Sequence, residues 1–312
     1  MTPLSEHIKS FAQQLAADFS VEFSDRLPGS VSRLCVCGMG GSGIVGEIAA
    51  MLYPSLPITT HKSYGLPAIR DKDVLYLVIS YSGSTIETRS SLELLIEEKL
   101  PCAVVAGGGA LYERALSAHI PCIRIPYDEH IPARFALASL LRGSILLLEN
   151  MGQKNPLDGL RIDSAHNKQG SVLAERIEGR SVLVYTPPSL EGLGIFWKQM
   201  LNESTKTAAF CNVFPELLHN EIESLGAVSN PYILMWQENN DIMLRRSIEA
   251  FVKICAEQGW PTEVFDQPEK SFVEQVMESI VFSYWTSLAL ADIKGIQPTE
   301  TPIIEALKRE LV

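Results

Sequence analysis

The chain lacks several features that mark whole classes of protein. None of its apolar runs approaches the roughly 20 residues that cross a bilayer, and its first 20 residues mix charges without the apolar core of a signal peptide. Positive charge is scarce: 26 Lys and Arg against 37 Asp and Glu give a net charge of −11, which disfavours nucleic acid and anionic membranes as partners. We therefore expect a cytoplasmic protein in which an anionic ligand needs a local cradle.

The chain also lacks the spacing of a metal site. Cys35 and Cys37 form a C-x-C pair within a strand pattern, but no second pair stands at the distance that zinc ligands need. The six histidines show no H-x-x-x-H pattern. We therefore predict that the six cysteines are buried free thiols, and that the protein holds no metal and no other cofactor.

Short apolar runs alternate with longer helical patterns, which is typical of α/β folds with helices on both faces of a parallel sheet. After an expected N-terminal helix at about 4–18, this series fills residues 1–152. A segment at 152–171, poor in apolar residues and rich in Gly, Pro, Asn and Asp, resembles a linker. The strand–turn–helix pattern then restarts, as a weak internal duplication. We predict two domains, 1–152 and 153–312, each an α/β/α sandwich.

A glycine-rich turn, "GMGGSG" at 38–43, lies between a strand pattern and a helix pattern. It fits G-x-G-x-x-G, but the dinucleotide-binding motif also needs an Asp or Glu about twenty residues later. Here His61 and Lys62 occupy that region. Two interpretations stay open at this point: an NADP site in which these cations meet the 2′-phosphate, and glycines that serve only a tight turn.

A second loop, "SYSGST" at 80–85, also joins a strand pattern to a helix pattern. Helix N-termini have unpaired N–H groups and partial positive charge, and they bind phosphate for this reason. The hydroxyls of Ser80, Ser82 and Thr85 add neutral donors, and the loop contains no Lys or Arg. Capping of the helix by Ser84 or Thr85 is the alternative, but it explains only one or two of these residues. We predict a phosphate-binding loop.

The two motifs resemble those of the sugar isomerase (SIS) domain, whose phosphate loop has the pattern S-x-S-G-x-T. With two tandem units, the whole chain resembles the bifunctional phosphoglucose/phosphomannose isomerase family. The resemblance implies two tandem SIS domains and an aldose–ketose isomerase that interconverts fructose 6-phosphate with glucose 6-phosphate and mannose 6-phosphate through a cis-enediol intermediate. It implies that the sugar phosphate binds at Gly41, Ser42, Ser80, Ser82 and Thr85.

Further motifs of the second half carry the same resemblance. Glu203 in "LNESTKTAAF" matches the family's catalytic glutamate, and a carboxylate suits the transfer of a proton between C1 and C2. His219 in "ELLHNEIES" matches the histidine that opens the sugar ring. The resemblance places this histidine in the partner subunit of a homodimer. Ser224 stands where the family often has glycine.

Two more residues match family motifs near the C-terminus, and one matches in the first half. Thr301 and Lys308 fit the Thr-Pro-…-Lys ending; the resemblance implies that Thr301 leaves room for both C2 epimers and that Lys308 assists ring opening. Arg134 matches the arginine of Pro-Arg-x-Ala-Leu, which faces the enediolate. One residue is inserted here between Pro132 and Arg134. A salt bridge at a helix start is the alternative for Arg134.

Two functions of other classes also stay open. A non-catalytic sugar-phosphate sensor would keep the phosphate loop and lose the acid–base groups, so the presence of Glu203, His219 and Lys308 disfavours it. An NADP-dependent oxidoreductase would use the glycine-rich turn with His61 and Lys62. The missing carboxylate and the hydroxyl-rich loop count against this second alternative.

Overall fold

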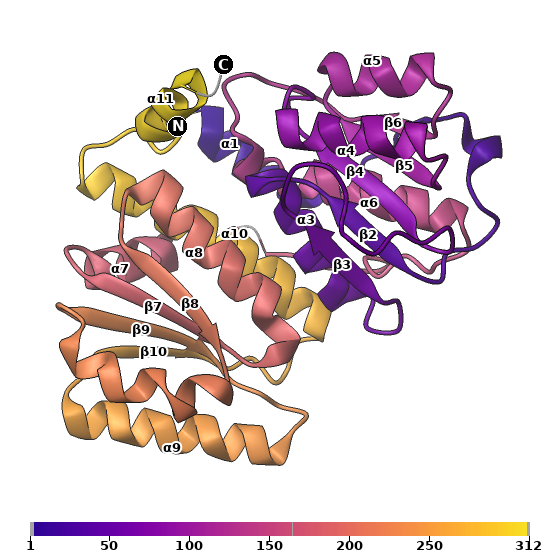
Figure 1. The fold of residues 1–312 in the computed structure, drawn as a ribbon. Coiled ribbons are helices and arrows are strands. Elements are labelled where there is room, and N and C mark those ends of the chain that lie inside the picture. The colour runs from indigo at the N-terminus through magenta and orange to yellow at the C-terminus, as the bar shows by residue number, and fades with distance from the viewer. Residues whose placement is uncertain (1–2, 164, 311–312) are drawn as a thin grey trace. The chain divides into compact units, whose positions relative to one another are not determined.

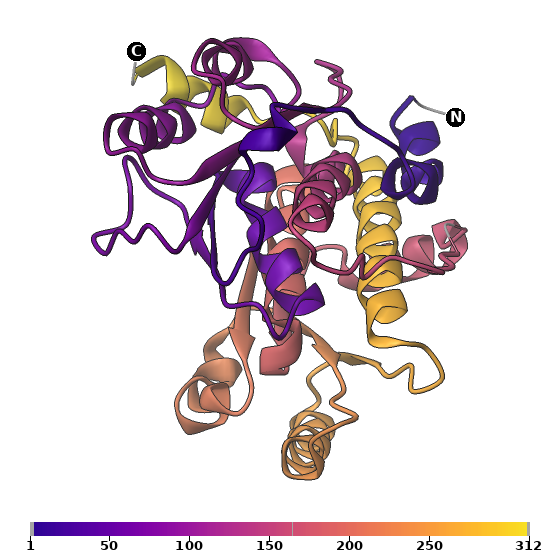
Figure 2. The same ribbon diagram turned by 90° about the vertical axis from the view of Figure 1, so that its right-hand side faces the viewer.

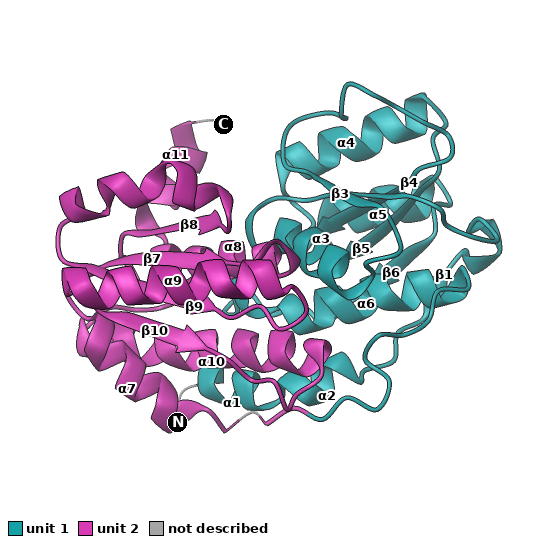
Figure 3. Cartoon of the chain, turned by 90° about the horizontal axis from the view of Figure 1, so that it is seen from below, with its two compact units in different colours: residues 1–161 teal, residues 162–312 magenta. Residues whose placement is uncertain are grey.

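A computed structural model describes residues 3–163 and 165–310 of the chain. The chain forms two compact units, residues 1–161 and 162–312, which Figure 3 shows in different colours. The division falls between Arg161 and Ile162. This division lies inside the polar segment at 152–171, which was predicted to be a linker. It is closer to the middle of that segment than the predicted domain boundary, which follows residue 152.

Unit 1 is built on a six-stranded sheet in the order β1-β6-β5-β4-β2-β3. Its strands are β1 (Val21–Glu22), β2 (Leu34–Cys37), β3 (Ile58–His61), β4 (Leu75–Ser80), β5 (Cys102–Ala106) and β6 (Cys122–Arg124). β2 to β6 run parallel, but β1 pairs antiparallel with β6 at the edge. The prediction of a purely parallel sheet is wrong at this edge, because a strand of two residues is too short to show a periodic pattern.

Helices cover both faces of the unit 1 sheet. They are α1 (Pro3–Lys9), α2 (Phe11–Leu15), α3 (Gly40–Leu52), α4 (Ile86–Glu97), α5 (Gly109–Ser117) and α6 (Leu137–Asn150), with the 3₁₀ turns η1 (Ser24–Arg26) and η2 (Ala133–Phe135). In Figures 1 and 3, α4 and α5 lie on one face and α3 and α6 on the other. Buried Tyr76, Val104 and Leu92 belong to the core under α4 and α5.

The sequence predicts one continuous N-terminal helix at about 4–18. This is wrong, because the structure has two short helices there, α1 and α2. Ser10 separates them, and its hydroxyl donates to the carbonyl oxygen of His7 at 2.8 Å. A serine side chain that bonds a nearby backbone carbonyl competes with regular helix geometry. The break therefore has a local cause that apolar periodicity does not reveal.

Unit 2 has a four-stranded, fully parallel sheet in the order β10-β9-β7-β8. Its strands are β7 (Ser181–Thr186), β8 (Ala209–Val213), β9 (Pro231–Trp236) and β10 (Thr262–Phe265). Its helices are α7 (Asn167–Ile177), α8 (Glu191–Thr205), α9 (Ile242–Gln258), α10 (Phe272–Ile293) and α11 (Pro302–Glu310), with η3 (Pro188–Leu190), η4 (Glu216–His219) and η5 (Glu221–Ala227). Sequence analysis missed β8, a partly exposed edge strand, and α7.

Two apolar layers enclose the unit 2 sheet. On one side, Trp197 of α8 contacts Trp236, Phe265 and Phe282 of β9, β10 and α10. On the other side, Phe251 of α9 packs in the core with residues of β7 and β9. Figures 1 and 2 show α10 running beside α7. The arrangement is the α/β/α sandwich that the periodicity predicted.

The two sheets share one topology. The order β5-β4-β2-β3 in unit 1 corresponds to β10-β9-β7-β8 in unit 2, which agrees with the predicted internal duplication. By this correspondence, the loop that follows β4 in unit 1 is equivalent to the loop that follows β9 in unit 2. The ends of these strands are where ligands bind in open α/β sheets.

All six cysteines are free thiols. Cys35, Cys37, Cys122 and Cys255 are buried as predicted, but Cys102 and Cys211 are only half-buried, so the prediction is wrong for these two. Within the described ranges, no three His, Cys, Asp or Glu side chains are placed to hold a metal ion. In the same ranges, no helix is both long and apolar enough to cross a membrane.

Candidate active site

Hydroxyl groups of the loop after β4 lie at the N-terminal end of α4. Thr85 is the N-cap residue, but its side chain caps no backbone N–H. Its Oγ1 lies instead 3.2 Å from the Ser80 Oγ, which accepts a hydrogen bond from the Gly83 N–H at 3.1 Å. The Ser82 and Ser84 hydroxyls are 2.9 Å apart. Capping by Thr85 is therefore wrong, and the positive end of the helix dipole has no counter-charge from this residue.

Glycines after the neighbouring strand β5 support this loop. Gly83 has a φ of +67°, and a Cβ there would lie 1.7 Å from the carbonyl oxygen of Gly108. The Gly107 N–H donates to the Tyr81 carbonyl oxygen at 3.1 Å, and the Leu111 N–H donates to the Gly83 carbonyl oxygen at 2.9 Å. Sequence analysis missed this support, although three consecutive glycines at 107–109 were its signal.

Tyr81 anchors the loop from below. Its ring is buried 5.1 Å from the Tyr127 ring, and its hydroxyl accepts a hydrogen bond from the Asp128 N–H at 3.0 Å and donates to the Asp128 carbonyl oxygen at 3.3 Å. Burial raises the pKa of the phenol, so Tyr81 stays neutral at physiological pH. The loop therefore rests on uncharged groups, which leaves the helix dipole and the hydroxyls to set its charge preference.

The glycine-rich turn joins the loop at 80–85 and η2. The Ser42 hydroxyl accepts a hydrogen bond from the Tyr81 N–H at 3.0 Å. A Cβ at Gly41 would lie 2.4 Å from the Arg134 backbone nitrogen, so only glycine permits this approach. The structure thus brings the predicted residues of unit 1 together around the start of α3 and α4.

Gly38 and Gly43 have a structural role, and Lys62, one of the two cations of the NADP hypothesis, is paired with a carboxylate. A Cβ at Gly43 would lie 2.5 Å from the Gly38 carbonyl oxygen, so these two glycines form the turn itself. The Lys62 ammonium pairs with the Glu47 carboxylate at 2.5 Å. A 2′-phosphate at Lys62 would stand next to this carboxylate, and the repulsion disfavours the NADP site.

Arg134 lies in η2, before the helix at whose start it was predicted. The inserted Ala133 is part of this 3₁₀ turn, which follows Pro132. The Arg134 side chain is buried, with 5% of the residue exposed, and its guanidinium lies 5.6 Å from the centre of the Phe135 ring. The arginine is therefore held in place beside the glycine-rich turn.

In unit 2, Glu203 and Thr301 line one pocket of about 550 Å³. It lies between the C-terminal end of α8 and the start of α11. The lining residues are Asn202, Glu203, Lys206, Thr207, Ala208, Thr301, Pro302, Ile303 and Ile304. The Gln199 amide donates to the Glu203 Oε1 at 2.9 Å. The pocket thus holds an oriented carboxylate and a hydroxyl against mostly apolar walls, which suits a general base.

The two other catalytic candidates of unit 2 lie outside this pocket's lining. Lys308 is exposed on α11. His219 is exposed at the end of η4 and follows β8, whereas Glu203 precedes β8. A five-residue strand spans about 15 Å. Glu203 and His219 of one chain therefore lie near opposite ends of β8. The structure does not bring these two residues together within one chain.

A buried network anchors the segment that carries His219. The Glu221 carboxylate accepts hydrogen bonds from the Tyr185 hydroxyl at 2.6 Å and from the Asn212 amide at 2.5 Å. Burial, together with this contact, raises the pKa of Tyr185. Ser224 lies in η5, and its hydroxyl donates to the Glu221 carbonyl oxygen at 2.9 Å. Serine therefore fits here without the left-handed backbone that would require glycine.

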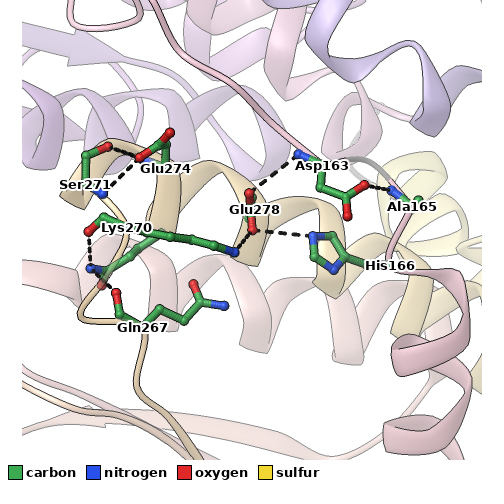
Figure 4. A network of polar contacts seen from close by, with 9 residues as sticks. Asp163, Ala165, His166, Gln267, Lys270, Ser271, Glu274 and Glu278 are labelled. Atoms are coloured by element: carbon green, nitrogen blue, oxygen red, sulfur yellow. Dashed lines mark hydrogen bonds and ion pairs between the residues drawn. The ribbon is translucent and has the colours of Figure 1, made fainter.

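A second cavity of unit 2, of about 450 Å³, contains a network that no motif predicted (Figure 4). The Glu278 side chain is 7% exposed and pairs with the Lys270 ammonium. The Asp163 N–H points at its other oxygen at 3.5 Å. His166 Nε2 lies 3.6 Å from the carboxylate, too far for a hydrogen bond. Because a lysine of the same unit neutralises Glu278, we interpret the network as a structural tie between α10 and the segment before α7.

The comparisons with known proteins agree with these features. Residues 166–311 match the family described as the C-terminal SIS domain of bacterial phospho-glucose isomerase. The match defines the class that residues 166–311 resemble, the SIS domain. More particularly, several bifunctional phosphoglucose/phosphomannose isomerases are 25–29% identical to most of the chain. That of Aquifex aeolicus is 29% identical and covers 88% of this chain and 89% of its own length. The predicted resemblance is confirmed.

Two other similarities limit what can be carried over. D-glucosamine-6-phosphate 4-epimerase of Sulfolobus acidocaldarius is also 29% identical and covers 90% of each chain. A solved structure of a hypothetical protein from Thermus thermophilus has a TM-score of 0.69 at 17% identity and covers 98% of this chain and 88% of that one. The structural match supports the fold alone. The 4-epimerase shows that relatives of equal identity carry different names.

Replacement of Lys270 tests the structural role of the Glu278 network. In Lys270→Met the buried carboxylate loses its cation, and we expect the free energy of unfolding to fall by about 2–4 kcal/mol. Urea unfolding followed by tryptophan fluorescence reports on unit 2, because all four tryptophans lie there. Lys253→Met, at an exposed position of α9, is the matched control and should change stability by less than about 0.5 kcal/mol. Equal midpoints for the two variants would contradict the interpretation.

Proposed function

We propose that this protein is an aldose–ketose isomerase that interconverts fructose 6-phosphate with glucose 6-phosphate and mannose 6-phosphate through a cis-enediolate. The single observation that carries the proposal is the hydroxyl loop at 80–85, at a helix start that Thr85 leaves uncapped. The similarity to bifunctional isomerases supports the same activity.

In this proposal the phosphate binds to unit 1. Backbone N–H groups at the start of α4 and the hydroxyls of Ser80, Ser82 and Thr85 donate to its oxygens. Gly41 and Ser42 form the adjoining wall, since the Ser42 hydroxyl is bonded to the same loop. Neutral donors attract a phosphate group only at short range. They can therefore bind it in a protein whose net negative charge repels anions elsewhere.

The equivalent loop of unit 2 is unsuited to phosphate. After β9, Glu238 is buried and accepts hydrogen bonds from the Ser189 hydroxyl at 3.1 Å and the Asn240 N–H at 2.6 Å. Asp241 caps α9 by accepting from the Met243 and Leu244 N–H groups. The chain's own carboxylates thus use the donors that a phosphate would need. This supports one phosphate site per chain, in unit 1.

We assign the chemistry to four side chains. Glu203 is the base that moves a proton between C1 and C2, as its orientation by Gln199 allows. Arg134 stabilises the negative charge that develops on the sugar oxygens. His219 and Lys308 act in ring opening, in which an imidazole can accept or donate the ring-oxygen proton.

The separation of His219 from Glu203 along β8 supports a homodimer with shared sites. If His219 acts beside Glu203, it must come from a second copy of the chain, because the two residues of one chain lie near opposite ends of β8. Thr301 lies in the Glu203 pocket, where we propose that its small side chain admits both C2 epimers. Unit 1 is proposed as the first SIS domain and unit 2 as the second. A cytoplasmic location stays a prediction.

Replacement of loop hydroxyls tests the phosphate site. A hydrogen bond to a charged group contributes about 1.5–3 kcal/mol, so in Ser82→Ala and Thr85→Val we expect KM for fructose 6-phosphate to rise on the order of 10- to 100-fold, with a smaller change in kcat. Ser117→Ala, on the exposed end of α5, is the control. An unchanged KM in both loop variants, measured in a coupled assay, would exclude the loop as the phosphate site.

Replacement of the proposed base tests the reaction. We expect the wild-type protein to convert fructose 6-phosphate to both aldose phosphates, with or without EDTA, and Glu203→Gln to lose on the order of 10²–10⁴-fold in kcat. Binding of fructose 6-phosphate, measured by calorimetry, should be retained in this variant. Wild-type protein that binds hexose 6-phosphates without converting them would identify a sensor. An activity that Glu203→Gln leaves unchanged would exclude Glu203 as the base.

A further inference from the structure

Lys206 lines the same pocket as Glu203 and Thr301. It directly follows α8, at the C-cap position, with φ 52° and ψ 33°. Glycine is the usual residue in this left-handed conformation at a helix end. A lysine in this conformation is uncommon.

The Lys206 ammonium joins two separate segments of unit 2. It donates to the carbonyl oxygen of Glu203, in the last turn of α8. It also donates to the carbonyl oxygen of Glu300, at 2.5 Å, directly before Thr301. Carbonyl groups of a last helical turn have no partner within the helix, and a cation is favoured beside them. One charged group therefore links the backbone of Glu203 to the backbone beside Thr301.

The start of α11 has little other apolar support within the described chain. α11 buries none of its residues, and Ile303 in its first turn is 85% exposed. Apolar packing in the same chain therefore contributes little to the position of Thr301. The hydrogen bond from Lys206 to the Glu300 carbonyl oxygen is a charged polar contact directly before Thr301.

A second lysine holds the backbone of Lys206 in place. The Lys294 ammonium, just after α10, donates to the Lys206 carbonyl oxygen at 3.4 Å and to the Thr207 hydroxyl at 3.2 Å. Burial lowers the pKa of Lys294, as expected for an ammonium group that has exchanged water for protein acceptors. Lys206 thus forms hydrogen bonds through its side chain and through its backbone carbonyl group.

We propose that Lys206 is a positioning residue of the Glu203 pocket: its ammonium group sets the separation between the carboxylate of Glu203 and the hydroxyl of Thr301. The inference rests on the proposed isomerase function. Since Thr301 is proposed to admit both C2 epimers, Lys206 also sets how the enediolate partitions between glucose 6-phosphate and mannose 6-phosphate. A displacement of about 1 Å is enough to cost on the order of 100-fold in rate.

Lys206→Gly is the sharpest test, because glycine suits the left-handed backbone and the side chain with its ammonium is lost without backbone strain. We expect an unchanged melting temperature, a kcat lower on the order of 10- to 100-fold, a smaller change in KM, and a changed ratio of the two aldose products. Lys206→Arg keeps a cation and should recover part of kcat. Lys253→Met, on exposed α9, is the control and should behave as wild type.

Amide hydrogen exchange gives a second measurement that needs no activity. In Lys206→Gly the amides of residues 301 and 303–306 should exchange faster than in wild type, whereas those of α9 should not change. Wild-type kcat, product ratio and exchange in Lys206→Gly would overturn the proposal. A wild-type protein without isomerase activity would instead refute the proposed function, and faster exchange at 301 and 303–306 would still support the tether. If Lys206→Gly does not fold, Lys206→Asn, which tolerates the left-handed backbone and lacks the ammonium, is judged by the same exchange and product-ratio criteria.

Discussion

The N-terminal end of α4 is the constraint on which the proposed chemistry depends. Its first N–H groups have no partner inside the helix, and Thr85 at the N-cap bonds Ser80 in place of capping them. Such an end costs stability unless water or a ligand satisfies it. In a chain of net charge −11, it offers backbone and hydroxyl donors to a phosphate dianion, although Glu87 lies in its first turn.

Several parts of unit 1 keep this end open and correctly shaped. Gly83 allows the loop to pass against Gly108, and Gly41 allows η2 with Arg134 to approach α3. Side chains at these glycines would displace backbone rather than flexible atoms. The topology of unit 2 repeats the same sheet, but Glu238 and Asp241 fill the equivalent loop with internal anions. Of the two equivalent helices, α4 therefore has no side-chain cap from its N-cap residue, whereas α9 is capped by Asp241.

Much of this could be predicted from the sequence, for physical reasons. Long periodic segments predicted α8, α9 and α10. Hydroxyls at a strand–helix junction predicted a loop at the start of α4, whose phosphate binding stays a prediction. The edge strands β1 and β8 were missed because short or half-exposed strands carry weak patterns. Lys206 and the Glu278 network were missed because their contacts join residues up to 115 positions apart. No local spacing encodes such contacts.

In the proposed reaction an enediolate forms and a carboxylate moves the C2 proton. Proton NMR of the aldose phosphates formed from fructose 6-phosphate in D₂O tests this step. We expect deuterium at C2 of both glucose 6-phosphate and mannose 6-phosphate in at least part of the product, because a carboxylic acid exchanges its proton with solvent. Turnover that leaves C2 of both products free of deuterium would contradict it.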